Sequence, residues 1–252
     1  MTKSEIRAVR SLADKQGRTE LGAFIAEGAK LVDEICASQQ LRTRKIYVSS
    51  DAAARRFAGA ERIAPAEMER ISRLATPADV LAVVEIPRHD LAAADASHAL
   101  VLALDGVQNP GNLGTLIRLA DWFGIGDVVC SPDCADCFNP KVVQATMGAI
   151  LRVRVHYTAL PEWLAAARRG GAPVYGTFLE GDNLYTTELT AAGIVVMGNE
   201  GRGITDTAAR YVTRRLLIPP YPADRRSSES LNVAMAAGII CAEFRRQALL
   251  HR

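Results

Sequence analysis

Residues 100–130 read LVLALDGVQNPGNLGTLIRLADWFGIGDVVC and contain a strand, a loop, a helix and a second strand in succession. The opening LVLAL is continuously apolar, which is typical of a parallel strand buried on both faces. A loop with Gly106, Gly111 and Gly114 follows, and apolar residues with helical spacing then run to residue 123. This stretch decides the fold class because the same order of elements is repeated after it.

The repetition continues to the end of the chain. Strands are expected at residues 100–104, 127–130, 152–156, 174–178, 194–197 and 216–218. Helices are expected at residues 113–123, 140–150, 162–169, 205–211 and 230–250. Alternation of strand and helix predicts an α/β fold with a mostly parallel sheet.

The first third of the chain has a different pattern and is expected to form its own α/β domain. Its expected helices lie at residues 4–15, 27–38, 51–57 and 65–74, and its expected strands at 45–49 and 81–86. Pro87 ends the second strand, and the polar, alanine-rich stretch after it is typical of a linker. We therefore expect one domain over residues 1–88 and a second over residues 98–252.

Composition is that of an ordinary globular protein, with 49% hydrophobic and 23% charged residues in a chain of 252. Disorder is excluded as the main state because there is ample apolar surface to bury. The N-terminal residues have no apolar core of a signal peptide, and the longest uncharged apolar stretch, residues 231–242, is too short to span a bilayer. The expectation is a cytoplasmic protein with no membrane partner.

The cysteine content does not favour a disulfide framework or a metal site. There are five cysteines, an odd number, and Cys130, Cys134 and Cys137 lie close together. A structural zinc site needs four ligands, and this cluster offers a single CxxC pair. The ligand count favours free thiols, so no metal is expected.

The net charge of +2 gives no general indication of a nucleic-acid partner, but the charge is unevenly distributed. Residues 1–18 contain five Lys or Arg and two acidic residues, and residues 202–226 contain six and two. Charge runs are usually solvated surface. The alternative is contact with the phosphates of a nucleic acid, which depends on local clusters and not on the chain-wide sum.

Three loops follow buried strands and carry the polar residues that chemistry needs. The first, DGVQNPGNLG, offers Asn112 as a helix N-cap, free N–H groups for an anion, and Arg118 in the helix that follows. Neither the dinucleotide nor the P-loop fingerprint is present. The plain alternative is a tight strand–helix turn with a surface arginine.

The second loop lies in IVVMGNEGRGITD, residues 194–206, and contains Gly198, Gly201, Gly203 and one acid, Glu200. A carboxylate at the centre would repel a phosphate, so the loop suits a ligand with hydrogen-bond donors. The alternative is a structural turn in which Glu200 caps a helix or pairs with Arg202.

The third loop lies in LLIPPYPADRRSSESLNVAMAAGIICAEF, residues 216–244. Ser228 or Ser230 can cap the last helix, and Asn232 presents an amide just inside it. That helix is apolar nearly all round, so it is buried in the core or packs also against a second subunit. The three loops are expected to share one site.

At these residues the chain resembles a known family. NPGNLGTLIRLADWFG, MGNEGRG and IP…SLNVAMAAG, in that order, are similar to the three motifs of the SpoU (TrmH-like) RNA ribose methyltransferases of the SPOUT class. The motif region spans about residues 101–247. Residues 1–88, with RTELGAFIAEGAKLVDE, are similar to the substrate-binding domain that many of these enzymes carry.

The resemblance implies an α/β domain with a C-terminal trefoil knot that binds S-adenosylmethionine and forms a homodimer through the knotted domain and the C-terminal helix. The implied reaction is methyl transfer to a ribose 2′-hydroxyl in RNA, with rRNA favoured by the N-terminal domain. The alternatives are a tRNA 2′-O-methyltransferase, an RNA-binding α/β protein without catalysis, and a small-molecule nucleotide enzyme.

The resemblance also implies the site residues. Arg118, Asn109, Glu200, Ser230 and Asn232 match the catalytic motifs. Cofactor contacts are expected at Thr177, Phe178, Leu179, Gly198, Ile218 and Leu231. The two basic clusters, and not the motifs, give the expected RNA contacts: Arg7, Arg18, Arg202, Arg225 and Arg226. The loop between Ile218 and Ser230 is longer than is usual in the family, so the family's cofactor contacts within that loop are not transferred.

Overall fold

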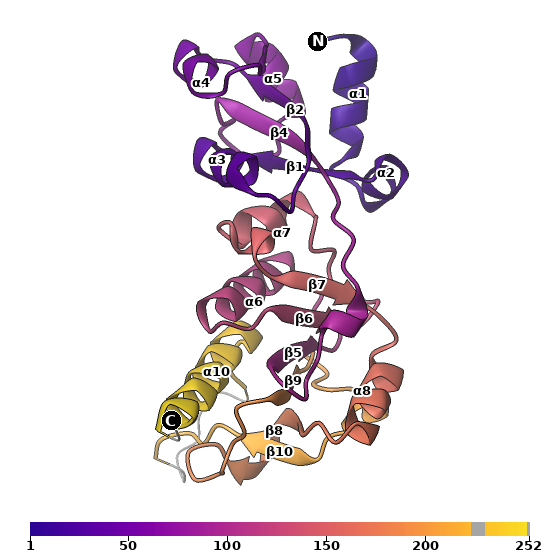
Figure 1. Cartoon of the computed structure of the whole chain (residues 1–252), viewed down its shortest axis with the longest axis vertical. Coiled ribbons are helices and arrows are strands. Elements are labelled where there is room, and N and C mark those ends of the chain that lie inside the picture. The colour runs from indigo at the N-terminus through magenta and orange to yellow at the C-terminus, as the bar shows by residue number, and fades with distance from the viewer. Residues whose placement is uncertain (223–229, 251–252) are drawn as a thin grey trace. The chain divides into compact units, whose positions relative to one another are not determined.

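The computed structural model describes residues 1–222 and 230–250 (Figure 1). Arg225 and Arg226, two of the expected RNA contacts, lie outside the described residues, as does Ser228. The chain divides into two compact units: Met1–Arg88 with Asp136–Leu151, and His89–Ala135 with Arg152–Arg252. Every helix in the described ranges is too short or too polar to cross a lipid bilayer.

A four-stranded sheet forms the centre of the first unit, in the order β1-β4-β2-β3. Its strands are β1 (Ala23–Glu27), β2 (Thr43–Val48), β3 (Glu61–Arg62) and β4 (Val80–Glu85). The β1/β4 and β2/β4 pairs are antiparallel, and the β2/β3 pair is parallel. Five helices accompany the sheet: α1 (Lys3–Ser11), α2 (Lys15–Leu21), α3 (Ala29–Ala37), α4 (Asp51–Arg56) and α5 (Pro65–Ile71).

Two expectations for this unit were wrong. The helix expected over residues 4–15 is two helices, because the chain turns after Ser11 so tightly that a Cβ on Gly17 would lie 2.1 Å from the Ser11 carbonyl oxygen. Strand β1 was not expected, since residue 27 was assigned to the following helix. All five residues of β1 are buried, and a short run of this kind has no alternating pattern by which to identify it.

The segment 136–151 packs with the first unit, although the sequence analysis counted it in the second domain. It contains α7 (Pro140–Ala145) and the short 3₁₀ helix η2 (Ala149–Leu151). The Phe138 ring lies 4.8 Å from that of Phe24 in β1. Gln144 Nε2 donates a hydrogen bond of 3.0 Å to the main-chain oxygen of Glu27. The segment therefore completes the edge of the sheet at β1.

Arg18 is buried in this unit and holds the same segment. Its side chain is 3% exposed and donates to the Asp136 carboxylate, at 2.9 Å from Nε. Nη1 donates to the carbonyl oxygens of Leu12 and Ala13, each at 2.8 Å. The expectation that Arg18 contacts RNA is wrong, because its guanidinium is enclosed and already bonded.

The second unit is built on a six-stranded sheet in which every pair is parallel, in the order β10-β8-β9-β5-β6-β7. The expected α/β fold with a mostly parallel sheet is confirmed. The strands are β5 (Leu100–Leu104), β6 (Asp127–Cys130), β7 (Arg154–Tyr157), β8 (Val174–Asn183), β9 (Gly193–Met197) and β10 (Arg214–Leu217). The central strands β5 and β9 are buried along their whole length.

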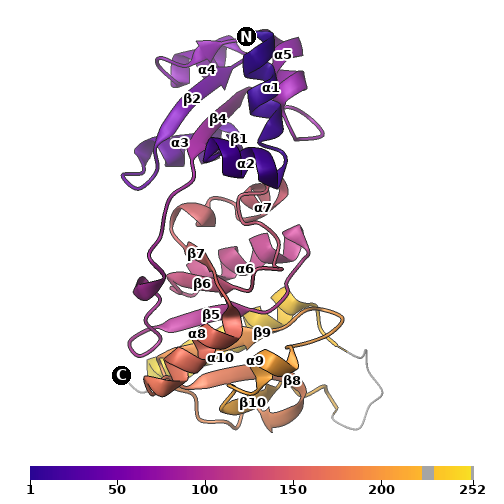
Figure 2. The same cartoon turned by 90° about the vertical axis from the view of Figure 1, so that its right-hand side faces the viewer.

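Helices cover both faces of this sheet (Figures 1 and 2). On one face, α6 (Pro110–Trp122) packs beside α10 (Val233–Leu250). On the other, α8 (Leu160–Arg169) and α9 (Asp206–Ala209) close an aliphatic core against β5, β8 and β9. The linker before β5 forms the 3₁₀ helix η1 (Leu91–Ala93). Helices on both faces of a parallel sheet leave its carboxyl edge open for a site.

The buried Arg18–Asp136 pair gives a stability prediction. Arg18→Ala leaves a partly buried carboxylate without its cation and two main-chain carbonyls without their donor. Removing one partner of such a pair is expected to lower the free energy of unfolding by about 3 kcal/mol, measured by urea denaturation. Arg7→Ala, at an exposed position of α1, is the matched control and should change it by less than about 0.5 kcal/mol. Equal stability of the two variants would contradict the structural role of Arg18.

Candidate functional site

Two of the three loops start side by side at the carboxyl edge of the parallel sheet. Leu104 ends β5 and Met197 ends β9, and these two residues are register partners. The Asp105 N–H donates to the Met197 carbonyl oxygen at 2.9 Å, which extends the pairing one residue into the loops. The glycine-rich loops are therefore adjacent because their strands are neighbours in the sheet.

Asn112 joins all three loops through its side-chain amide. Its Nδ2 donates to Glu200 Oε1 of the second loop at 2.5 Å. Its Oδ1 accepts from Asn232 Nδ2 of the third loop at 3.1 Å. This chain of hydrogen bonds brings the three loops together, as a shared site requires.

The structure gives the asparagines other tasks than those predicted from the sequence. Asn109, not Asn112, caps α6, and its Oδ1 accepts from the N–H groups of Gly111 at 2.8 Å and Asn112 at 3.2 Å. The interpretation of Asn112 as the N-cap was wrong. The Asn109 oxygen is engaged in capping, and a role of Asn109 in the chemistry of the site stays a prediction. The signal that could have found the cap is the spacing: a Pro at the first helical position places the cap at residue 109.

Asn232 has a second task besides its bond to Asn112. Its Oδ1 accepts from the N–H groups of Ala234 at 3.0 Å and Met235 at 3.3 Å. It therefore caps the start of α10, the task that the sequence analysis gave to a serine. Ser230 lies two residues earlier and is exposed. The cap fixes the Asn232 amide in the direction of Asn112.

The second loop is held closed by its own backbone. Asn199 and Gly203 exchange two main-chain hydrogen bonds, of 3.0 and 2.9 Å. Asn199 Nδ2 donates to the Gly106 carbonyl oxygen at 2.8 Å, which ties this loop to the first one. A Cβ on Gly198 would lie 2.2 Å from the Gly203 carbonyl carbon, so only glycine fits there. Glu200 bonds Asn112 in this arrangement, and Arg202 lies instead 3.6 Å from the Asp133 carboxylate.

Arg118 is exposed on α6 at helical spacing from Gly111 and Thr115, so it lies on the same helix face as the first loop. It makes no hydrogen bond or ion pair with any described residue. Its guanidinium is always charged at neutral pH and offers five donors. The structure therefore leaves a cation at the edge of the site with its donors available to a ligand.

The expected cofactor residues lie on neighbouring strands. Pairing of β8 with β9 ends at Gly176 and Val196; Thr177 comes directly after the first, and Gly198 lies two residues after the second. Leu179 and Leu231 are 68% and 49% exposed. Ile218 follows β10, which is the other neighbour of β8. The Arg215 guanidinium lies 3.6 Å from the centre of the Phe178 ring and covers one of its faces.

Cys134 holds the first loop in place through hydrogen bonds of its sulfur. Its sulfur accepts from the Val107 N–H and donates to the Leu104 carbonyl oxygen, each at 3.3 Å. A hydrogen bond with the Cys130 thiol and one with Ser131 lower the Cys134 pKa to about 7, against the opposing effect of burial. The described residues contain no group of three or more His, Cys, Asp or Glu side chains placed to hold a metal ion.

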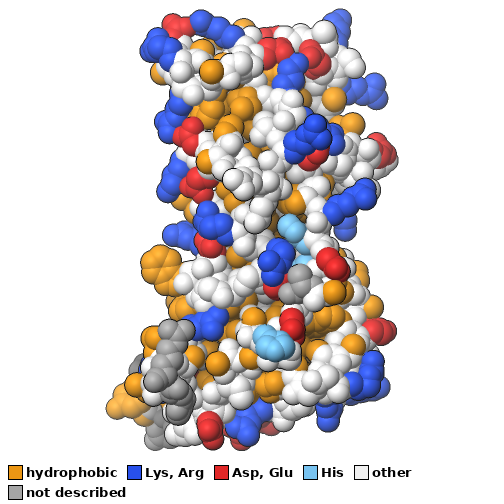
Figure 3. Space-filling model, viewed as in Figure 1, with side chains coloured by type: hydrophobic (Ala, Val, Ile, Leu, Met, Phe, Trp, Pro, Cys, Tyr) orange, Lys and Arg blue, Asp and Glu red, His pale blue; other side chains and the backbone are white. Residues whose placement is uncertain are grey.

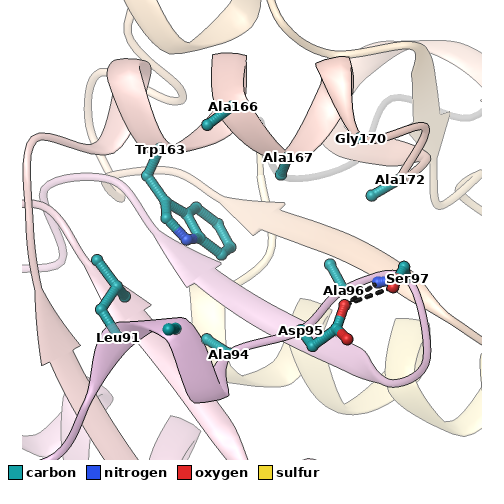
Figure 4. A pocket seen from close by; sticks show the side chains of 11 residues that line it. Leu91, Ala94, Asp95, Ala96, Ser97, Trp163, Ala166, Ala167, Gly170 and Ala172 are labelled. Carbon is teal, nitrogen blue, oxygen red and sulfur yellow. Dashed lines mark hydrogen bonds between the residues drawn. The ribbon is translucent and has the colours of Figure 1, made fainter.

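A hollow of about 440 Å³ lies elsewhere in the second unit, between η1 and α8 (Figure 4). Its walls are mainly alanines with Leu91 and Trp163. The single carboxylate, that of Asp95, is engaged by Ser97 and His98. No motif residue lines it, so it is not the site that the three loops form.

An open parallel sheet whose loops gather beyond the carboxyl ends of its central strands defines an α/β protein with a ligand site at that edge. The chain belongs to the SpoU rRNA methylase family, whose model matches residues 99–242. A second family model, the MRM3-like substrate binding domain, matches residues 3–82. Both resemblances stated from the sequence are thereby confirmed.

Relatives of known name match nearly the whole chain. The 23S rRNA (guanosine(2553)-2′-O)-methyltransferase RlmP of Bacillus subtilis is 30% identical over 96% of both chains. A TrmH-family protein from Porphyromonas gingivalis superposes with a TM-score of 0.88 at 40% identity, over 98% of this chain and 99% of that one. The SpoU methyltransferase AviRb from Streptomyces viridochromogenes, solved with S-adenosylmethionine, gives a TM-score of 0.85 at 25% identity, over 98% and 99%.

The close packing of Gly198 gives a prediction with a control in the same loop. In Gly198→Ala the added methyl meets main-chain atoms of residues 203 and 204, which cannot rotate away. We expect a loss of more than about 2 kcal/mol in the free energy of unfolding, measured by urea denaturation. A Cβ on Gly201 meets only Asn199 Oδ1, at 3.6 Å. Gly201→Ala should leave stability unchanged, and tolerance of both substitutions would disprove the packing argument.

Proposed function

We propose that this chain transfers a methyl group from S-adenosylmethionine to the 2′-hydroxyl of a ribose in ribosomal RNA. The observation that carries the proposal is the Asn112 amide, which joins the three family motifs into one site. The comparisons support it, because RlmP is named for this reaction and AviRb was solved with this cofactor.

Ribosomal RNA is preferred to tRNA because RlmP, which acts on 23S rRNA, matches the first unit as well as the second. A chain that works on rRNA is expected in the cytoplasm, where ribosomes are assembled. A non-catalytic RNA-binding protein is disfavoured, since such a protein has no need for the linked polar groups of three loops.

The residues at the carboxyl edge fit the cofactor. Exposed Leu179 and Leu231 offer apolar surface to an adenine ring, and the backbone of Thr177–Leu179 and Gly198 offers donors and acceptors. Ile218 and Phe178 complete the proposed contacts. S-adenosylmethionine supplies the methyl group when it is bound. The trefoil knot expected of this family, which would enclose the cofactor, forms part of the proposal.

The polar side chains orient and stabilise the reacting hydroxyl. The Arg118 guanidinium is a positively charged donor, so its role is to stabilise the developing alkoxide and a nearby phosphate. Glu200 and Asn232, fixed by Asn112, orient the ribose, and exposed Ser230 lies beside them. Positioning of this kind is worth up to about 7–11 kcal/mol of the barrier.

RNA reaches this site along exposed basic residues. Arg7 and Arg202 are exposed and are proposed to contact phosphates. The ion pair between Arg202 and Asp133 is exposed, so a phosphate can take the place of the Asp133 carboxylate. Lys and Arg side chains are spread over the face seen in Figure 3 and do not gather in one patch.

A homodimer through α10 is part of the proposal. In the single chain, Met235, Ile239 and Ala242 form an apolar stripe on α10 that its neighbour α6 does not cover, and Met235 is 64% exposed. Trp122 at the end of α6 is 83% exposed. Large apolar side chains at the surface of a packed helix pair mark an interaction surface.

The role of Arg118 is tested by methyl transfer. With tritiated S-adenosylmethionine and protein-free 23S rRNA, Arg118→Ala should lower turnover by about 10²–10³-fold, as for removal of an oxyanion donor. Cofactor affinity by calorimetry should stay near normal. Arg169→Ala, an exposed arginine of α8, is the control. Full activity in Arg118→Ala would refute the assignment, and absence of any 2′-O-methyl added to rRNA by the native chain would refute the function.

The dimer is tested by placing a charge in the apolar stripe. Met235→Asp would bury a carboxylate in the proposed interface, which is costly without a partner. Sedimentation should show a dimer for the native chain and a monomer for this variant. Ala166→Asp, at an exposed position of α8, should remain dimeric. A native monomer at micromolar concentration would contradict the proposal.

A further inference from the structure

A second pocket, of about 440 Å³, lies in the first unit between strand β1 and the segment that contains α7. Its lining comes from the end of β1, the residues after α5, and α7. The volume lies within the range of small-ligand sites. The proposed mechanism at the three loops uses none of these residues.

The floor of this pocket is rich in hydrogen-bond acceptors. Glu27 is 5% exposed, and its carboxylate accepts from Ser72 Oγ at 2.5 Å and from the Arg73 N–H at 2.8 Å. A carboxylate has about four acceptor positions, so capacity remains after these two bonds. Gln144 donates through Nε2 to the Glu27 main-chain oxygen, which fixes the direction of its amide. The amide oxygen Oε1 has two lone pairs and can accept a hydrogen bond.

The mouth of the pocket is cationic. Arg73 and Lys141 are exposed and line it from opposite segments. Arg73 Nη2 donates to the Arg10 carbonyl oxygen at 2.9 Å, which holds the guanidinium in place. Lys141 makes no side-chain hydrogen bond or ion pair with any described residue. Between floor and mouth the walls are apolar: Ile25, Leu74, Ala75, Pro140 and Ala145.

We propose that this pocket binds one unstacked nucleotide of the RNA substrate. The base lies between the apolar walls and directs its amino or imino donors at Glu27 and Gln144, and its phosphates lie against Arg73 and Lys141. A free phosphate does not suit the pocket, because the Glu27 carboxylate would repel it. Single-stranded RNA is commonly read through splayed bases held by hydrogen bonds to their edges. The inference rests on the proposed function and adds a specificity site, lined by residues of the substrate binding domain match and by residues 140–145 of the SpoU methylase match.

Lys141→Ala tests the proposed phosphate contact, and Gln144→Leu tests the proposed base contact. With the full chain and protein-free 23S rRNA, Lys141→Ala should weaken binding about fivefold to tenfold and reduce the slope of log Kd against log salt by about one. Gln144→Leu should weaken binding without changing that slope, because it removes a base contact and no charge. Arg55→Ala, an exposed cation of α4 outside the pocket, should change neither quantity.

Ultraviolet crosslinking of the native chain to the same RNA provides a test that needs no variant. Crosslinked nucleotides on peptides containing residues 73–75 or 140–145 would support the proposal, and their absence from both would overturn it. Methyl transfer distinguishes a failure of the pocket assignment from a failure of the proposed function. If the native chain methylates rRNA and both variants bind it like the native chain, the pocket assignment fails while the proposed function stands. If the native chain methylates no rRNA, the proposed function itself fails.

Discussion

The site depends on a single carboxamide. Asn112 can serve two loops at once because an amide carries donors on one side and an acceptor on the other. Its donors are directed to Glu200 and its acceptor to Asn232, which leaves only one orientation of the amide consistent with both bonds. Three segments that are far apart in the sequence therefore share one rigid reference point. The other features of the edge, the Asn109 and Asn232 caps and the closed turn at Gly198, hold the two ends of this chain of bonds in place.

Much of the second unit could be predicted from the sequence, because continuous apolar runs such as 100–104 and 127–130 have one simple interpretation. The strand boundaries at β5 and β6 agree with the expectation to the residue. The first unit was harder. Strand β1 contains Ala and Glu among its five buried residues, and no periodicity distinguishes it from a helix start. Its Glu27 is buried because Ser72 and Arg73 satisfy it, which depends on a contact 45 residues away.

The site residues, too, could be predicted where the nearby sequence defines them and could not where a distant contact does. The motif positions were assigned through the resemblance to the family, and the structure brings Glu200 and Asn232 together on Asn112, with Arg118 exposed on α6. The task of each asparagine was not predictable in the same way, because a cap and a bridge need the same residue type. Arg18 illustrates the limit for charge. A count of basic residues placed it among the RNA contacts, whereas its partner Asp136 lies 118 residues further along the chain and encloses it.

The first unit is discontinuous in sequence, and this bears on how the protein is made. The Phe24 ring, the Arg18 guanidinium and the Glu27 carbonyl each have a partner in residues 136–151. A ribosome that has synthesised the first 88 residues has therefore produced a sheet with one bare edge and a buried cation without its anion. The N-terminal unit can be completed only after β5, α6 and β6 have been translated. The last contacts of the first unit therefore form after the first two strands of the parallel sheet have been synthesised.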